Sequence, residues 1–258
     1  MILIKSEKEV DVMRRAGDIL ARCFIAIEPL IAEGVKTRDI DRAADEFIRS
    51  HGASPSFLGV SGFVDGAPNY PAASCISINE EVIHGIPGGR ELRAGDVVSV
   101  DMGVYFHGYH SDMARTYAVG KASELALRLI KVTEECFWDG VKCAVEGLRV
   151  FDISKMIQQC AEAVGFSVVR DFVGHGIGAE LHEAPQIPNY YERRSRSGQR
   201  LSNGMALAIE PMVNAGGYEI SVRPDKWTVV TKDGSLSAHY ENTILVNGDK
   251  PLILSAAV

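Results

Sequence analysis

The strongest constraint on the fold of this chain is an internal repeat. Residues 33–40 read Glu-Gly-Val-Lys-Thr-Arg-Asp-Ile and residues 146–153 read Glu-Gly-Leu-Arg-Val-Phe-Asp-Ile, an offset of 113. Residues 95–101, Gly-Asp-Val-Val-Ser-Val-Asp, match residues 204–210, Gly-Met-Ala-Leu-Ala-Ile-Glu, with an offset of 109. The agreeing offsets predict two related halves, about residues 5–120 and 122–248, although one helix-to-strand connection used twice would give the same pattern.

Each half begins with two helical patterns and continues with strands. A capping-box pattern at Ser6 and Glu9 begins the first helix, which Gly34 ends. We expect a second helix over 37–50 with Thr37 as its N-cap, and two more over about 123–146 and 152–164. Strand patterns occupy 74–78, 96–102, 113–119, 168–171, 205–211, 227–231 and 240–246. Neither half has a complete core pattern, so we predict a single α+β domain over residues 1–258 in which the halves share one sheet.

A long connecting segment lies between the second helix and the first full strand. Residues 52–71 are rich in Gly, Pro, Ser and Asn, which predicts a loop with at most a short strand. Loops of this length inside a compact domain are more often functional or mobile than idle. We therefore expect this loop to be functional or mobile.

Charge and cysteine content exclude several classes of protein. The chain has 27 Lys and Arg against 34 Asp and Glu, a net charge of −7, and so lacks the basic character of a dedicated nucleic-acid binder. No apolar run approaches the roughly 18 residues that span a bilayer, and the N-terminus does not resemble a signal peptide. The five cysteines form no CxxC motif, which favours reduced thiols and a cytoplasmic protein.

Two aspartates bracket a predicted hairpin in the first half. Asp101 ends an apolar strand, Asp112 begins the next, and His107-Gly108 can form the turn between them. An antiparallel hairpin would place the two carboxylates roughly opposite each other, where like charges repel unless a cation lies between them. Two solvated acids near a turn are the simpler alternative.

Two glutamates occupy the corresponding places in the second half. Glu210 is flanked by apolar residues, and Glu241 precedes an apolar strand. Burying one acid without a partner costs several kcal/mol. Four such acids at related strand ends therefore indicate a metal site.

Three histidines lie beside glycines or turns. His175 has a glycine on each side, so the backbone can approach closely without hindering the imidazole, and His182 follows seven residues later. His84 is followed by Gly85, and a structural turn histidine is its alternative interpretation. His175 completes a set of four carboxylates and one imidazole, which disfavours a structural zinc site and suits Mn, Fe(II) or Co. Five protein ligands are more than one catalytic ion needs and fit two ions that share carboxylates.

These motifs resemble the type I methionine aminopeptidases, which belong to the M24 metallopeptidases and have the pita-bread (creatinase/aminopeptidase) fold. The resemblance covers nearly the whole chain. It is carried by segments 79–87, 99–102, 111–120, 174–178, 181–187, 208–212 and 240–246. It implies two pseudo-symmetric halves that share a curved antiparallel sheet covered by two helix pairs. It also implies a cytoplasmic monomer that removes the initiator methionine from nascent proteins whose second residue is small.

The resemblance implies a role for each candidate residue. Two divalent ions, with Co, Mn, Fe(II) and Zn left open, would be held by Asp101, Asp112, His175, Glu210 and Glu241. A hydroxide between the ions would attack the scissile carbonyl. Asp112 and Glu241 resemble the bridging ligands, and Glu210 the residue that also moves the proton.

His182 resembles the histidine that binds the carbonyl oxygen, and His84 the one that contacts the scissile amide nitrogen. Tyr70, Cys75 and Trp227 would form the methionine pocket, whose apolar character suits a thioether.

Two departures from the family pattern concern substrate preference. The loop Phe57–Pro71 is longer than in many bacterial members, and Leu181 stands where relatives often have an aromatic residue. A proline-specific peptidase of the same fold is an alternative, but such relatives usually have an additional N-terminal domain. An inactive relative that binds RNA or ribosomes is another alternative, but such proteins lose ligands that this chain retains.

A basic segment stands out in this acidic chain. Residues 193–200 contain Arg193, Arg194, Arg196 and Arg200. A solvated loop is the simplest interpretation, and contact with ribosomal RNA through its phosphates is the functional alternative.

Overall fold

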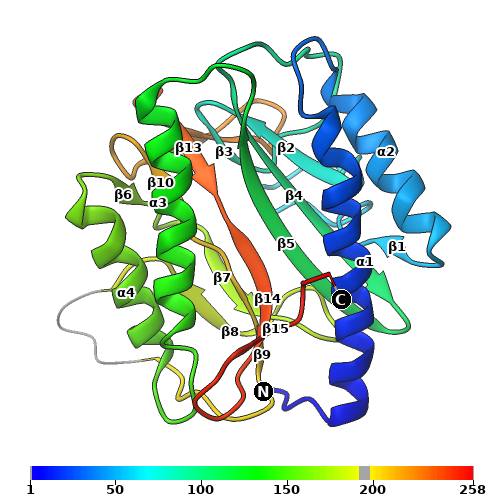
Figure 1. Ribbon diagram of the computed structural model, residues 1–258, viewed down its shortest axis with the longest axis vertical. Helices are drawn as coiled ribbons and strands as arrows, with labels where there is room; N and C mark the ends of the chain where they lie inside the picture. The colour runs from blue at the N-terminus through cyan, green and yellow to red at the C-terminus, as the bar shows by residue number, and fades with distance from the viewer. Residues whose placement is uncertain (1, 192–197, 258) are drawn as a thin grey trace.

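The computed structural model describes residues 2–191 and 198–257 as two helix pairs packed against a central sheet (Figure 1). The first pair is α1 (Glu7–Ile27) and α2 (Thr37–Ser50), with a short 3-10 turn η1 (Glu28–Leu30) after α1. The second pair is α3 (Glu124–Val141) and α4 (Val150–Ala163). The predicted α+β class is confirmed, and both pairs fall where the sequence repeat predicts helices.

The central sheet takes strands from both halves of the chain. Its path runs β1-β4-β5-β14-β9-β7-β8, with β2 added on β4 and β15 on β14, and every pairing is antiparallel. Two further three-stranded sheets, β13-β10-β6 and β11-β12-β3, lie beside it. The strands are β1 (Ser54–Pro55), β2 (Ser74–Ile78), β3 (Glu81–Ile83), β4 (Val97–Phe106), β5 (Tyr109–Ala118), β6 (Ser167–Val168), β7 (Val173–Gly176), β8 (Glu183–Pro188), β9 (Ala206–Ile209), β10 (Met212–Asn214), β11 (Ile220–Val222), β12 (Val229–Thr231), β13 (Ser237–His239), β14 (Glu241–Leu245) and β15 (Leu252–Ile253). The halves meet where β14 pairs with β5, so the expectation of one shared sheet is confirmed.

Each helix pair covers its own part of the sheet with its own apolar cluster. Leu20, Ile40 and Val100 belong to the cluster under α1 and α2. Leu129 and Ile153 belong to the cluster under α3 and α4. All five of these side chains are essentially inaccessible to water, and burial of each contributes about 1.5–3 kcal/mol relative to exposure. The helices therefore fix the sheet from one side and leave its other face for function.

The starts of the first two helices follow different rules. At α1, the carboxylate of Glu9 accepts hydrogen bonds from the backbone N–H (2.7 Å) and the hydroxyl (2.6 Å) of Ser6, as the capping-box pattern predicts. At α2, the prediction that Thr37 is the N-cap is wrong, because Lys36 occupies that position. The Thr37 hydroxyl instead accepts a hydrogen bond from the N–H of Gly88 and donates one to its carbonyl.

Several strands of the second half were not foreseen: β7, β8, β10, β11, β13 and β15. β7 contains two glycines and β8 contains Pro185 and Pro188, and both residue types weaken a strand pattern. Much of the basic segment, Arg193 to Arg196, lies outside the described residues. No helix in the described part of the chain is long and apolar enough to cross a membrane.

Candidate metal centre

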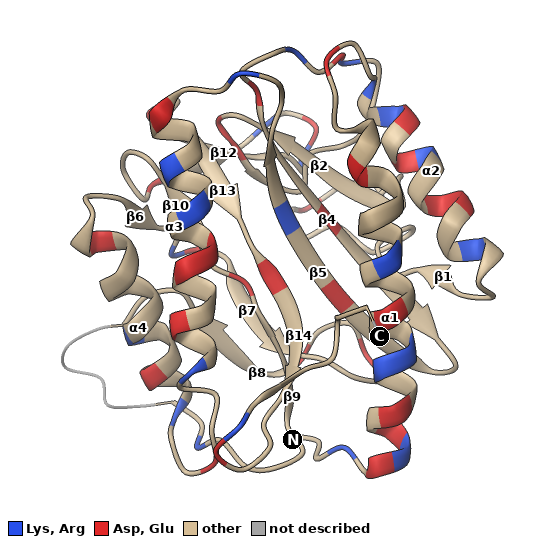
Figure 2. Cartoon of the chain, in the orientation of Figure 1, with Lys and Arg blue, Asp and Glu red and all other residues tan. Residues whose placement is uncertain are grey.

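A row of paired residues crosses the middle of the sheet. Asp101 on β4 pairs with Ala114 on β5, and Ala114 pairs with Glu241 on β14. Directly paired residues point to the same face of a sheet. Ala114 presents only a methyl group between the two acids, so both carboxylates face the same space. Figure 2 shows acidic residues within strands β4, β5 and β14 at the centre of the molecule.

Asp112 joins this row from the next position on the same face. The turn between β4 and β5 consists of His107 and Gly108, both with positive φ (48° and 93°), as two-residue hairpin turns require. This turn sets the register so that Asp112 pairs with Gly103, two positions from the Asp101 row. The expectation of directly opposite aspartates is therefore wrong: the two are diagonal neighbours, because the turn rather than the spacing fixes the register.

The second half brings its ligand candidates in from the other side of β14. His175 on β7 pairs with Ala208 on β9, and Glu210 follows β9 directly. The His175 Nε2 lies 3.4 Å from Glu210 Oε1. The His175 Nδ1 is 2.9 Å from the carbonyl of Gly176, which can only accept, so Nδ1 carries the proton and Nε2 keeps a free lone pair. This tautomer is the one that binds a metal through Nε2.

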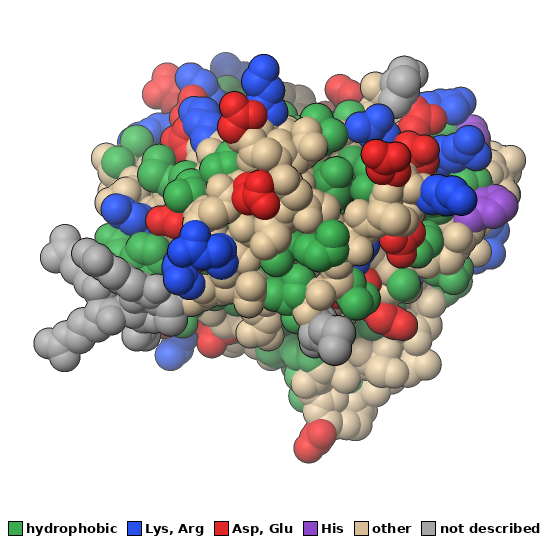
Figure 3. All heavy atoms as spheres, turned by 90° about the horizontal axis from the view of Figure 1, so that it is seen from below, with side chains coloured by type: hydrophobic (Ala, Val, Ile, Leu, Met, Phe, Trp, Pro, Cys, Tyr) green, Lys and Arg blue, Asp and Glu red, His purple; other side chains and the backbone are tan. Residues whose placement is uncertain are grey.

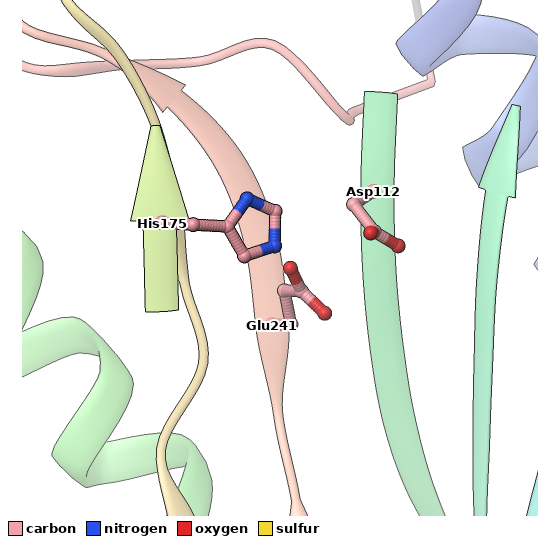
Figure 4. Close-up of side chains that lie close together, drawn as sticks. All are labelled: Asp112, His175 and Glu241. Carbon is pink, nitrogen blue, oxygen red and sulfur yellow. The ribbon is translucent and has the colours of Figure 1, made fainter. Parts of the chain in front are cut away.

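Two groups of side chains have the spacing of metal ligands. Ligand atoms of Asp112, His175 and Glu241 all lie within 4.8 Å of one another, and their side chains converge in Figure 4. Glu210, His239 and Glu241 form a second group by the same criterion. Ions that bind oxygen and nitrogen at about 2.0–2.2 Å fit between ligands at such separations.

The electrostatics of the cluster also fit divalent cations. Burial raises the pKa of Asp112 to about 7. Burial, followed by repulsion from Asp112, raises the pKa values of Asp101, Glu210 and Glu241 well above the usual range. Asp101 Oδ1 and Glu241 Oε1 are buried and have no hydrogen-bond partner in the described part of the chain. Four clustered acids with unsatisfied oxygens are costly unless cations neutralise them.

The other two predicted histidines lie beside this cluster. The His182 ring is 4.5 Å from the His175 ring, centroid to centroid, and burial lowers the pKa of His182. Burial, followed by the charge of His182, lowers the pKa of His84 to about 4. Both imidazoles are therefore neutral near pH 7. His84 also has a positive φ of 59°, a strained conformation of the kind that persists mostly at functional sites.

All ten predicted site residues border one cavity of about 670 Å³. Its apolar wall includes Tyr70, Cys75 and Trp227, and the Tyr70 and Trp227 rings are 4.9 Å apart. The Tyr70 hydroxyl donates to the carbonyls of Ser74 and Gly85, and the Trp227 indole N–H donates to the carbonyl of Pro68. Cys75 pairs with Asp101 across β2 and β4, so the apolar wall adjoins the carboxylates.

The sequence did not reveal three further groups at the site. Phe63 and Phe172 pack against His84, with ring centroids 5.4 and 5.5 Å away. Phe63 comes from the long loop, whose length indicated a functional or mobile segment. His239 stands two residues before Glu241 and lies behind the carboxylates, and no glycine or strand-end pattern marks it.

Comparisons with known proteins agree on one family. A model of metallopeptidase family M24 matches residues 11–248. The chain is 52% identical over 255 residues to a methionine aminopeptidase of Clostridium perfringens, covering 99% of each chain. It is 46% identical over 246 residues to methionine aminopeptidase 1 of Bacillus subtilis, covering 95% of this chain and 96% of that one.

Solved structures extend the comparison. The crystal structure of methionine aminopeptidase from Thermotoga maritima matches with a TM-score of 0.93 at 41% identity, covering 99% of this chain and 100% of that one. Prolidase from Pyrococcus furiosus matches with a TM-score of 0.78 at 21% identity, covering 98% of this chain and 65% of that one. The second likeness shows a common fold and nothing more specific.

Proposed function

The chain belongs to metallopeptidase family M24, and from this premise we propose that it is a metal-dependent aminopeptidase that removes N-terminal methionine when the next residue is small. Its fold is the pita-bread fold of its structural neighbours. One arrangement supports this function above all: the five metal-ligand candidates form the floor of a cavity whose wall is an apolar slot. Hydrolysis at the floor and recognition of an apolar side chain at the wall are what such an enzyme requires.

We propose that two divalent ions are held by Asp101, Asp112, His175, Glu210 and Glu241, with Asp112 and Glu241 shared between the ions. When bound, such ions activate water and polarise a substrate carbonyl. The donor set of carboxylates and one imidazole admits Co, Mn, Fe(II) or Zn, and availability decides among them. The unsatisfied oxygens of Asp101 and Glu241 support this assignment.

The proposed proton transfers use three side chains. Glu210 accepts the proton of the attacking water, since its carboxylate borders the cavity beside His175. His182, neutral and beside His175, donates a hydrogen bond to the carbonyl oxygen as negative charge develops there. His84, fixed by the surrounding aromatic rings, contacts the scissile amide nitrogen.

The methionine side chain would enter the slot between Tyr70, Cys75 and Trp227. The hydrogen bonds of Tyr70 and Trp227 to backbone carbonyls hold both rings in place before substrate arrives. A preformed apolar slot beside aromatic rings favours a flexible thioether. Phe57 and Leu181 also border the cavity and complete its apolar lining.

Peptide cleavage against defined metals tests this function. Protein freed of metal by chelation should cleave Met-Ala-Ser only after Co, Mn or Fe(II) is restored under anaerobic conditions. Met-Ile-Ser should remain intact, because its second residue is large. An Ala-Pro peptide serves as the alternative substrate, and its preferential cleavage would assign the chain to proline-specific hydrolysis instead.

We further propose that the enzyme is a cytoplasmic monomer acting on nascent polypeptides, with ribosome contact through residues 193–200. On the face in Figure 3, acidic, basic and hydrophobic side chains are interspersed. The four arginines within residues 193–200 support a contact with phosphates. Ribosome co-sedimentation should weaken when Arg193, Arg194, Arg196 and Arg200 are changed to alanine. Unchanged co-sedimentation would refute the contact without affecting the assigned reaction.

A further inference from the structure

His239 is a buried polar side chain that the proposed reaction does not use. It ends β13, is 1% exposed, and has no hydrogen-bond partner for either ring nitrogen in the described part of the chain. Its backbone is held firmly, because the Thr116 hydroxyl accepts from its N–H (2.9 Å) and donates to its carbonyl (2.8 Å). A fixed, fully buried imidazole without partners is costly unless it serves a neighbour.

The neighbours of His239 are the outer oxygens of two metal-ligand candidates. Its Nε2 lies 3.8 Å from Glu210 Oε2 and 3.9 Å from Glu241 Oε2. The other oxygen of Glu210, Oε1, faces His175 at 3.4 Å, and the other oxygen of Glu241, Oε1, has no hydrogen-bond partner among the described residues. The two glutamates thus turn their Oε2 atoms toward His239 and leave their Oε1 atoms for other partners.

The cavity lies on one side of these glutamates and His239 on the other. Glu210 and Glu241 line the cavity, whereas His239 is not among the described residues that line it. His239 is therefore placed to act on the carboxylates rather than on substrate. Distances of 3.8 and 3.9 Å exceed a direct hydrogen bond, but one bridging water or a small closing movement of the acids would complete it.

We propose that His239 is a positioning residue whose Nε2–H restrains the Oε2 atoms of Glu210 and Glu241, so that their Oε1 atoms remain directed at the ions. This rests on the proposed function, since it concerns the same ion site. Groups that orient metal ligands in this way change metal affinity or activity by about 10–100-fold when removed. A carboxylate released on one side can rotate and bind an ion through the wrong oxygen.

Two substitutions separate this role from simple packing. His239→Leu replaces the imidazole with an apolar side chain of similar size and so removes the N–H donor. His239→Gln retains an N–H donor at the end of its side chain. Ser237→Ala is the matched control, because Ser237 is a buried polar residue on the same strand that bonds Asn214 instead of the glutamates. Circular dichroism and thermal unfolding of each metal-free variant establish that it folds.

Calorimetric titration of metal-free protein with Mn(II) measures ion binding apart from cleavage. We expect His239→Leu to weaken Mn(II) binding and lower kcat for Met-Ala-Ser by about 10–100-fold each, with little change in KM. His239→Gln should recover most of both losses, and Ser237→Ala should match the wild type. Wild-type Mn(II) affinity and kcat in a folded His239→Leu protein would overturn the proposal. Failure of the wild type to bind Mn(II) would instead refute the proposed function.

Electron spin echo spectroscopy of the Mn(II)-loaded protein counts nitrogen ligands. We expect one directly bound nitrogen, from His175, in both the wild type and His239→Gln. A second strongly coupled nitrogen that disappears in His239→Gln would overturn the positioning role and make His239 a ligand.

Discussion

The two halves of the molecule enter their second helices in the same way. Gly34 and Gly147 have φ of 85° and 87°, and their N–H groups donate to the carbonyls of Leu92 and Leu201. The next residue of each, Val35 and Leu148, accepts from the N–H of the same leucine. Gly34 and Gly147 are 113 residues apart, and Leu92 and Leu201 are 109 residues apart, which are the two offsets of the sequence repeat. We propose that the halves arose by duplication, since hydrogen bonds as well as residues correspond.

The halves differ in how they join their central strands. In the first half, β4 and β5 are joined by two residues, His107 and Gly108. In the second half, the chain between β9 and β14 covers residues 210–240 and contains β10 to β13. The two-residue turn fixes Asp101 and Asp112 relative to each other. The long connection between β9 and β14 brings Trp227 and His239 to the site. Each half thus supplies two of the four acids, which lie beside a two-residue turn in the first half and at the two ends of a long connection in the second.

Removing one acid from each half gives the largest expected effect. Asp112→Ala and Glu241→Ala should each lower kcat/KM for Met-Ala-Ser about a thousandfold or more, since the ions contribute several kcal/mol and 1.4 kcal/mol is tenfold. Bound metal, measured by elemental analysis, should fall in both. Glu135→Gln, an exposed acid on α3, is the control. Full turnover by Asp112→Ala would show that cleavage does not need acids from both halves.

Two of the histidines that line the cavity, His84 and His182, come from different halves and should differ in effect. His182→Ala should lower kcat about 100–1,000-fold, the usual loss of a donor to a developing oxyanion. His84→Asn, which tolerates the positive φ, should lower it only about tenfold, as expected for one lost hydrogen bond. Steady-state kinetics compares them, with His51→Gln on the distant helix end as control. Equal losses would contradict the assigned roles.

The pH dependence of stability tests whether both halves contribute buried acids. The raised pKa of Asp112, about 7, means that the folded metal-free protein holds protons that the unfolded chain releases. This stabilisation is present at low pH and is lost as pH rises through 7. The buried histidines have lowered pKa values and oppose this trend only below their unfolded value of 6.5.

The melting temperature of the metal-free protein should therefore fall as the pH rises from 6.5 to about 7. Bound Mn(II) should abolish most of this fall, because the ion replaces the protons. Asp112→Asn and Glu241→Gln should each flatten the dependence. Scanning calorimetry at constant ionic strength measures it, and a melting temperature that rises over this range would refute the assignment of raised pKa values.

The equivalent turn glycines give the smallest expected effect and the sharpest test of duplication. Gly34→Ala and Gly147→Ala should each destabilise the protein by about 1–2 kcal/mol, the cost of a left-handed conformation for a residue with a Cβ. Among the described residues, chain neighbours aside, no atom lies within 4 Å of a Cβ at Gly34, and only Arg200 Nη1, at 3.9 Å, does so at Gly147. Urea denaturation measures the change. Gly88→Ala, in open space without positive φ, should be neutral, and unequal losses at the two turns would weaken the correspondence.

Local patterns predicted much of the scaffold, and long-range contacts explain the rest. Helix α2 and strand β2 lie over the residues expected, because periodicity and end signals are local. The acids were recognised because a charged residue ends an otherwise apolar strand. The diagonal placement of Asp101 and Asp112 depends on turn register, which spacing alone does not reveal. His239 depends on β13 lying behind two distant glutamates, a tertiary contact with no local signal.

The place of β14 in the sheet has a consequence for synthesis. β14 is inserted between β5 and β9, yet its residues 241–245 are made after both of these strands. Domains fold from the N-terminus as the chain emerges, and contacts distant in sequence form slowly. The first aspartate pair can form early on its own hairpin, whereas Glu241 arrives only when the sheet closes. A chain whose residues 241–245 are still inside the ribosome therefore has no complete metal site, and cleavage can begin only after β14 has emerged.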